Sequence, residues 1–94
     1  MPNSKALTDP EILARLVNGD GQLTRWPRRA RDRQVVLNYL IDKFQRNHLY
    51  SETEVNAVLN QWHTFADAAN LRRQLFDYGY FGRTSSGDKY WRER

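Results

Sequence analysis

The spacing of the apolar residues changes near Gly79, and this change limits the possible folds more than any other feature of the sequence. Before Gly79, apolar residues recur three or four positions apart in several segments, as they do in amphipathic helices. After Gly79, two short extended runs surround the turn-forming residues 85–88, SSGD. The sequence therefore predicts a set of helices followed by a β-hairpin.

Two helices are expected in the first half of the chain. LTDPEILARLV has capping-box spacing between Thr8 and Glu11, and the following NGDG ends it. QLTRW is short enough for an edge strand. RDRQVVLNYLIDKF is the clearest helix, and its apolar face consists of Val36, Leu37, Leu40, Ile41 and Phe44.

Two further helices are expected before the hairpin. SETEVNAVLNQW begins with a capping box formed by Ser51 and Glu54, with Tyr50 placed as a hydrophobic staple. The next helix is expected to use Asp67 as its cap and Gly79 as its stop. Its inward side chains are expected to be Ala68, Leu71, Leu75 and Tyr78.

Three compact helices followed by a two-stranded wing are the plan of a winged helix-turn-helix. We therefore expect an α+β, mostly helical fold: three core helices, a C-terminal β-hairpin wing and an extra N-terminal helix. Residues 1–22 form the expected N-terminal helix and connector, and residues 23–94 the winged-helix-like domain, in one compact unit overall. A plain α+β domain with the same elements is the alternative.

Composition excludes several classes of function. The 94 residues include no cysteine, so disulfides and thiolate metal sites are ruled out. No apolar run is long enough to span a membrane, and the N-terminus has no leader pattern, so we expect a cytoplasmic protein without a membrane partner. His48 and His63 are isolated and expected in surface or turn positions. With no phosphate loop or nucleophile motif either, we expect neither an enzyme nor a cofactor or metal.

Basic residues are grouped in two blocks. The chain carries a net charge of +4, but residues 25–46 carry +5 and residues 72–94 carry +3. The segment between them, residues 47–71, is acidic and has no lysine or arginine. Two such blocks form a basic face if they meet in space, which indicates a nucleic-acid partner. The helix-hairpin order favours DNA over RNA as that partner, and the sequence leaves RNA open.

Four stretches carry a resemblance to a known family: WPRRARDRQVVLNYL, YSETEVNAVLNQWH, LRRQLFDYGYFGR and GDKYWR. From Leu23 to Arg92 the chain resembles the bacterial family catalogued as domain of unknown function 2087. Members occur alone and fused behind helix-turn-helix regulator domains, so the resemblance implies a link with transcription. It brings no catalytic residues, and it equally allows a sensor or contact module beside a separate DNA reader.

Three groups of residues are the candidate nucleic-acid contacts. The arginines of TRWPRRARDR suit phosphates, the outward side of the last helix suits base edges, and the wing cations suit the DNA backbone or the minor groove. In chain order the candidates are Arg25, Arg28, Arg29, Arg31, Arg33, Asn70, Arg73, Gln74, Arg83, Lys89 and Arg92.

Other residues are interpreted as structural. Arg72 is expected to form a salt bridge with a nearby acid, Asn56 to hydrogen-bond to a neighbouring turn, and Trp91 to pack in the core. The alternative function is a protein-interaction or sensing module, acting as a homodimer or with another protein. Its partner-facing patch would lie around Trp62 and Phe65 in the segment without basic residues.

Overall fold

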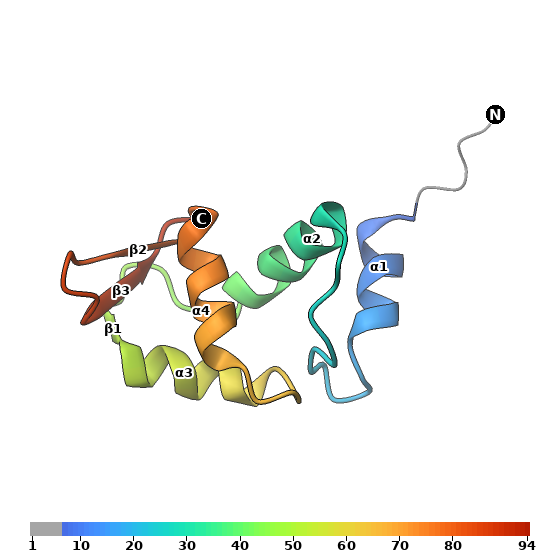
Figure 1. Ribbon diagram of the computed structural model, residues 1–94, viewed down its shortest axis with the longest axis horizontal. Helices are drawn as coiled ribbons and strands as arrows, with labels where there is room; N and C mark the ends of the chain where they lie inside the picture. The colour runs from blue at the N-terminus through green and yellow to red at the C-terminus, as the bar shows by residue number, and fades with distance from the viewer. Residues whose placement is uncertain (1–6) are drawn as a thin grey trace.

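The computed structural model describes residues 7–94, and residues 1–6 of the expected N-terminal segment lie outside them. The fold is α+β, with four helices and a three-stranded antiparallel sheet in the described part. Figure 1 shows the sheet at one end of the molecule and α1 at the other. The elements in chain order are α1 (Asp9–Leu16), α2 (Ala30–Ile41), β1 (Tyr50–Ser51), α3 (Glu52–Gln61), α4 (Ala68–Asp77), β2 (Phe81–Arg83) and β3 (Lys89–Arg92).

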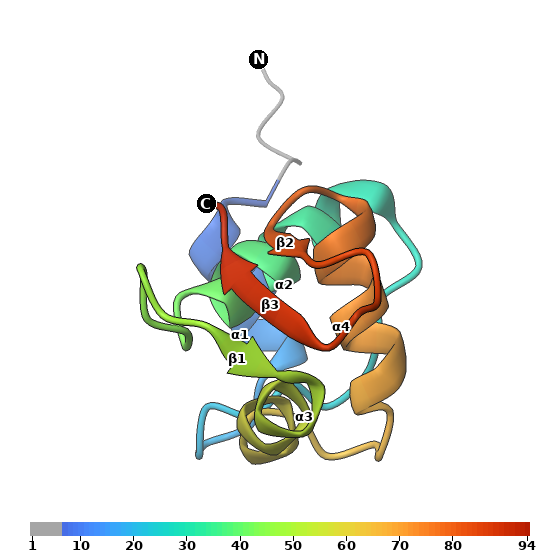
Figure 2. The ribbon, with the colours of Figure 1, turned by 90° about the vertical axis from the view of Figure 1, so that its left-hand side faces the viewer.

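The sheet contains one strand more than the expected hairpin. Its strand order is β1-β3-β2, so β3 lies between the other two (Figure 2). β2 and β3 form the hairpin, and β1 pairs with β3 through Tyr50 opposite Tyr90 and Ser51 opposite Lys89. Tyr50, expected as a helix staple, is thus a buried strand residue. A strand of two residues is too short to show alternation in the sequence.

Both predicted capping boxes are confirmed. The Ser51 hydroxyl accepts from the Glu54 amide at 3.1 Å, and the Glu54 carboxylate accepts from the Ser51 amide at 2.7 Å. Thr8 and Glu11 make the same reciprocal pair at the start of α1. These bonds satisfy amides that have no partner inside the helix, so both helices begin where the sequence predicts.

The start of α4 differs from the prediction. Asp67 is the N-cap residue, but its side chain makes no capping hydrogen bond. Its amide instead donates to Nε2 of His63 at 2.8 Å, while Nδ1 of His63 lies 2.7 Å from the Leu59 carbonyl oxygen. His63 lies in the connection between α3 and α4, the turn position that was one of the two expected, but it is buried at 4% exposure; His48 is exposed as expected. The imidazole ring joins the end of α3 to the start of α4.

The core forms one cluster that includes both α1 and the sheet. Ile12 and Leu16 of α1 belong to the same buried cluster as the α2 face and the aromatic rings of the sheet. Phe44 packs edge-to-face against both Tyr50 and Phe81, with ring centroids 5.2 and 5.0 Å apart. The apolar face predicted for α2 is confirmed, because all five of its residues are buried.

The inward position of Tyr78 is a wrong prediction. Its side chain is 55% exposed, and Tyr80, at 2%, fills the core instead. α4 ends at Asp77, and Gly79 then takes φ +78°. This left-handed conformation suits glycine and reverses the chain, which turns Tyr80 inward and leaves Tyr78 outside. The helix α4 therefore ends before Gly79, as predicted.

Trp91 is likewise not the core aromatic of the wing. Tyr90 is buried at 2% exposure, and Trp91, on the other face of β3, is half-buried against the neighbouring strand. The indole occupies the space in which a Cβ at Gly82 would lie, and its Nε1 donates to Glu93 at 3.0 Å. The missing side chain at Gly82 makes room for the indole outside the core.

The expected edge strand QLTRW does not form. Leu23 alone makes isolated bridges, antiparallel to Val17 and parallel to His63. Its amide donates to the Trp62 carbonyl at 2.8 Å, and its carbonyl accepts from Thr64 at 3.0 Å. Leu23 is fully buried, so this single residue connects the α1 end of the molecule to the turn between α3 and α4.

Residues 7–94 contain neither a helix that could span a membrane nor a cluster that could bind a metal. None of the helices there combines the length and the apolar character needed to cross a bilayer. The same residues contain no group of three or more His, Asp or Glu side chains arranged to hold a metal ion.

Candidate nucleic-acid interface

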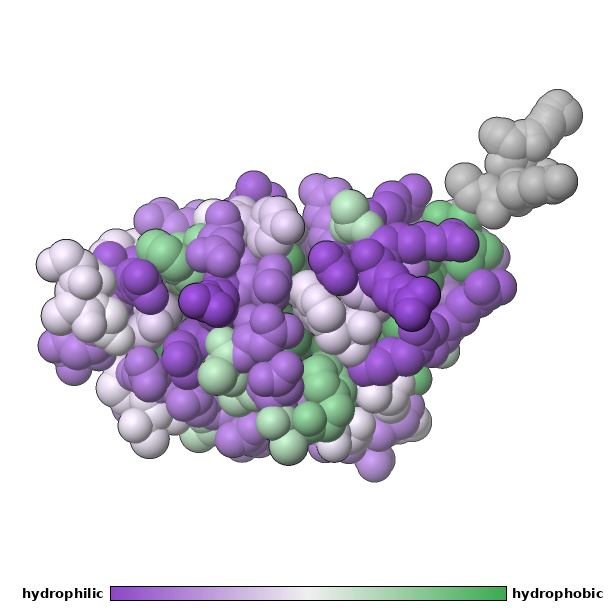
Figure 3. All heavy atoms as spheres, viewed as in Figure 1, coloured by the Kyte–Doolittle hydropathy of each residue, from purple (hydrophilic) through white to green (hydrophobic). Residues whose placement is uncertain are grey.

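An open groove between α1 and the segment before α2 gathers arginines from both. Its volume is about 530 Å³, and its base is apolar, with Ile12, Leu16 and Pro27 among the lining residues. Asp32 also lines it. Figure 3 shows strongly hydrophilic side chains gathered over α1 and the N-terminal end of α2. We call this site the arginine groove, after the arginines that line it: Arg15, Arg25, Arg28, Arg29 and Arg31.

Local hydrogen bonds bring the two sides of the groove together. Thr24 donates to the Leu16 carbonyl twice, from its amide at 2.8 Å and from its hydroxyl at 3.0 Å. The chain therefore returns alongside α1 before α2 begins. Arg31 donates to Asp9 at 2.8 Å and to the Leu7 carbonyl at 3.3 Å. Both partners of this ion pair are more than half exposed, so it contributes at most about 1 kcal/mol.

Arg25, Arg28 and Arg29 are exposed and make no side-chain hydrogen bond or ion pair within residues 7–94. Arg29 is also the N-cap residue of α2, and it makes no side-chain capping bond. The amides of the first helical turn thus have no side-chain cap and lie next to guanidinium groups without a side-chain partner; the Asp32 carboxylate in the same turn is the one acidic group among the described residues that line the groove. Free amides and the positive end of a helix dipole favour an anion there.

Arg33 lies outside the groove. Its Nε donates to the Pro27 carbonyl at 2.7 Å, and its guanidinium carbon lies 5.4 Å from the centre of the Trp26 ring. Among the arginines of TRWPRRARDR, Arg33 therefore differs from the groove residues, because it links the segment before α2 to α2 itself. Arg15, which lines the groove from α1, was missed by the sequence analysis because residues 1–22 carry a net negative charge.

On α4 a single candidate cation is exposed. Arg73 points to solvent, but Asn70 and Gln74 are half-buried and hydrogen-bond to each other at 3.3 Å. The carboxylates of Asp67 and Asp77 are exposed at the two ends of the same helix. Acids at both ends of α4 weaken its attraction for phosphate.

The structural role predicted for Arg72 is confirmed. Its side chain is mostly buried, donates to Asn56 and lies 3.7 Å from the Glu52 carboxylate. Asn56 thus has the structural hydrogen bond expected of it, although its partner is a side chain of α4 rather than a turn.

The wing cations have different surroundings. The Arg83 guanidinium stacks 4.0 Å above the ring centre of Phe76, and Lys89 is exposed. Arg92 donates to Asp42 and to the Phe44 carbonyl, each at 2.9 Å, and its side chain is only 12% exposed. It fastens β3 to the end of α2.

The tip of the wing is organised by Asp88. The hydroxyls of Ser86 and Thr84 each donate to its carboxylate at 2.7 Å, and these bonds lower the pKa of the carboxyl. A negative charge therefore lies beside Lys89.

The groove arginines of the first basic block and the wing cations of the second do not meet on one surface, whereas Arg33 and Arg94, one from each block, line a pocket together. The arginine groove adjoins α1, whereas the wing lies at the opposite end of the molecule (Figure 1). The aromatic residues proposed for a partner-facing patch, Trp62 and Phe65, are partly buried against the core. The ammonium of Lys43 lies 4.0 Å above the centre of the Trp62 ring.

Comparisons with known proteins give one match. Residues 22–92 match a family described as "Uncharacterized protein conserved in bacteria (DUF2087)". Searches among curated proteins and among solved structures found no match to the chain.

Proposed function

Because the chain belongs to the bacterial family DUF2087, whose description names no activity, we propose its function from its surface: a winged-helix-like domain that binds duplex DNA through the arginine groove. The role is transcription-linked, and the contacts are to backbone phosphates. Of the predicted contacts, the proposal keeps Arg25, Arg28, Arg29 and Arg31 and adds Arg15. It omits Arg33, which lies outside the groove, and Arg92, which is held by Asp42.

The order of the elements supports the winged-helix part of the proposal. From α2 onward the chain runs helix, strand, helix, helix, strand, strand, and the first strand pairs with the last. In that plan α3 and α4 are the helix-turn-helix pair, and the β2–β3 hairpin is the wing. Arg73 lies on the second helix of that pair and Lys89 on the wing, both away from the groove that carries the proposed contacts.

The arginine groove is the single observation that carries the DNA proposal. Guanidinium groups present a planar set of donors that fits phosphate oxygens. Arg25, Arg28 and Arg29 have no side-chain partner among the described residues, beside a helix start without a side-chain cap. A phosphate of the DNA backbone would satisfy these guanidinium and amide donors together.

The same geometry favours binding with little sequence preference. Phosphate contacts position a protein on DNA, whereas hydrogen bonds to base edges specify a sequence. Asn70 and Gln74, the side chains suited to adenine, bond to each other, and acids are exposed at both ends of α4. We therefore assign the larger part of the affinity to the groove.

A titration of a fluorescein-labelled duplex, followed by anisotropy, tests the proposal. Binding is expected at about 50 mM salt and should weaken steeply toward about 200 mM. Arg25→Gln, Arg28→Gln and Arg29→Gln should each reduce the slope of log K against log salt by about 0.9, because each removes one phosphate contact.

Arg46→Gln is the control, since it removes an exposed arginine beyond the opposite end of α2. An equal loss in this variant would contradict a site in the groove, and affinity independent of salt would contradict phosphate binding. Duplex RNA and single-stranded DNA of the same sequence are expected to bind more weakly than the duplex DNA.

A further inference from the structure

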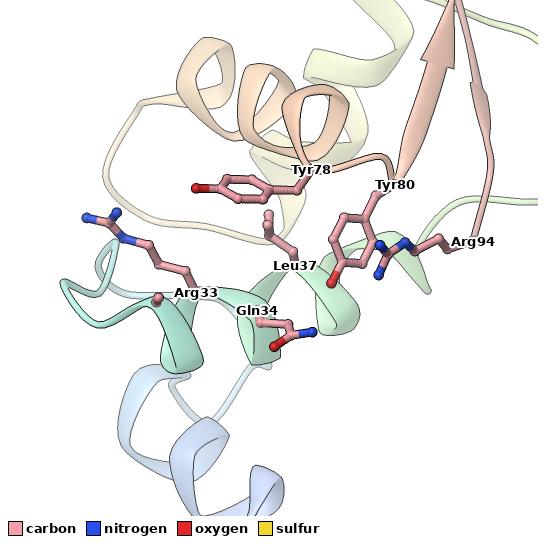
Figure 4. A pocket seen from close by; sticks show the side chains of 7 residues that line it. Arg33, Gln34, Leu37, Tyr78, Tyr80 and Arg94 are labelled. Atoms are coloured by element: carbon pink, nitrogen blue, oxygen red, sulfur yellow. The ribbon is translucent and has the colours of Figure 1, made fainter.

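A second open pocket lies between the N-terminal half of α2 and the end of α4. Its volume is about 280 Å³, and it shares no lining residue with the arginine groove. Figure 4 shows Leu37 and Gln34 projecting from α2 and the two tyrosines coming from the end of α4 and the residues after it. We call it the tyrosine pocket; its side chains include Arg33, Gln34, Leu37, Tyr78, Tyr80 and Arg94.

The aromatic walls of the pocket are held differently. Tyr80 is buried, and its hydroxyl donates to Asn38 at 2.8 Å, which fixes the ring. Tyr78 is 55% exposed and, together with Leu49, is one of the exposed large apolar side chains in residues 7–94. An aromatic ring that borders a pocket and remains exposed offers a flat surface for another ring.

The charged groups around the pocket are cationic. The guanidinium of Arg94 lies 4.4 Å above the ring centre of Tyr80, and Arg33 borders the pocket on the other side (Figure 4). Arg33 uses Nε to bond Pro27, which leaves its terminal nitrogens as donors. Among the described residues that line the pocket, none is acidic.

We propose that the tyrosine pocket binds a small planar aromatic carboxylate. The ring lies against Tyr78 and above Leu37, and the carboxylate pairs with the guanidinium of Arg94. Apolar and aromatic walls with a few fixed polar groups are the usual composition of a small-molecule site. The volume of about 280 Å³ lies just below the range of about 300–1,000 Å³ for such sites, which suits one or two fused rings.

The proposal goes beyond DNA binding and does not depend on it. It makes the domain a receptor for a small anion. Because the tyrosine pocket and the arginine groove share no lining residue, anion binding and DNA binding can each occur without the other.

The test uses 1-naphthoate as the probe and 1-naphthamide as its uncharged counterpart. Titration of the ¹⁵N-labelled full chain, followed by amide chemical shifts, locates the site. We expect 1-naphthoate to shift amides in residues 33–37 and 76–80. Binding should be about tenfold tighter than that of the amide, because a charge-assisted hydrogen bond is about twice as strong as a neutral one.

Two variants and two matched controls separate the ring contact from the charge contact. Tyr78→Ala removes an exposed wall, and Arg94→Gln removes the cation; each should weaken 1-naphthoate binding several-fold, and Arg94→Gln should also abolish the preference over the amide. Leu49→Ala, at an equally exposed apolar side chain, and Arg73→Gln, at an exposed arginine outside the pocket, should leave the affinity unchanged.

Several results would overturn the proposal. One is equal affinity for 1-naphthoate and 1-naphthamide. Another is a set of amide shift changes confined to residue 15 and residues 25–32, and a third is the absence of shift changes at millimolar probe. The effect of Arg94→Gln must also exceed that of Arg73→Gln, or the preference is only a general response to charge. DNA titration of the same variants reports on the proposed function separately.

Discussion

His63 joins the end of α3 to the start of α4 through one side chain. Its Nδ1 lies 2.7 Å from the Leu59 carbonyl oxygen, and its Nε2 accepts from the Asp67 amide. A ring that donates through Nδ1 and accepts through Nε2 is the neutral tautomer with its proton on Nδ1. The histidine thereby holds the amide of the N-cap residue Asp67, whereas the amides of the first turn of α4 have no side-chain cap.

Replacing this residue should be costly. We expect His63→Ala to lower the free energy of unfolding by about 2–4 kcal/mol, because it leaves a cavity and removes the hydrogen-bond partner of the Asp67 amide and of the Leu59 carbonyl. His48→Ala, at an exposed histidine, should change it by no more than about 0.5 kcal/mol. Urea unfolding at neutral pH measures both, and similar losses in the two variants would contradict the structural role of His63.

The individual helices depend on short-range signals that are visible in the sequence. The two capping boxes and the apolar face of α2 depend on residues three or four positions apart, and the sequence predicts all three features. β1 was not predicted, because it pairs with residues about forty positions away. The burial of Tyr80 in place of Tyr78 was not predicted for a related reason. It depends on the chain reversal at Gly79 and on the space available in the core, and neither is visible in a local sequence pattern.

The capping boxes predict a dependence of stability on pH. The hydrogen bond from the Ser51 amide is the main cause that lowers the pKa of Glu54, and the Thr8 amide does the same for Glu11. A carboxyl whose pKa is lower in the folded state stabilises the fold above its unfolded pKa of about 4.3, and the contribution is lost as the pH falls through the folded pKa.

Glu54→Gln isolates one of these contributions. Glutamine retains the shape of the capping box but does not titrate, so the variant should lose less stability than the wild-type protein between pH 7 and pH 3. Urea unfolding at both pH values measures the difference, with Asp77→Asn as a control that removes an exposed carboxyl outside both boxes. Identical losses in Glu54→Gln and the wild type would contradict the prediction.

The molecule as a whole has its arginine groove at one end and its sheet at the other, joined by one core. The sequence predicts that basic residues occur in blocks, but not which ones share a surface. The hydrogen bond from Thr24 to the Leu16 carbonyl brings Arg15 close to Arg25 and Arg28. Arg92, by contrast, forms an ion pair with Asp42. Such contacts are tertiary, and only the folded chain shows which cations remain exposed.

The shared core predicts cooperative unfolding of both ends. Leu16→Ala should lower the free energy of unfolding by about 2–5 kcal/mol, because Leu16 is 2% exposed. Leu13→Ala, on the same helix but only partly buried, should lower it less. Tryptophan fluorescence samples Trp26, Trp62 and Trp91, and circular dichroism samples the helices; the two transitions should coincide. A separate early transition would show that α1 unfolds on its own.

The contact between Gly82 and Trp91 has a consequence for substitutions at either position. Because the indole occupies the space that a side chain at position 82 would need, the two positions cannot change independently. A side chain at position 82 therefore requires the indole of Trp91 to move or to be replaced by a smaller residue, so the effects of substitutions at the two positions should not be additive.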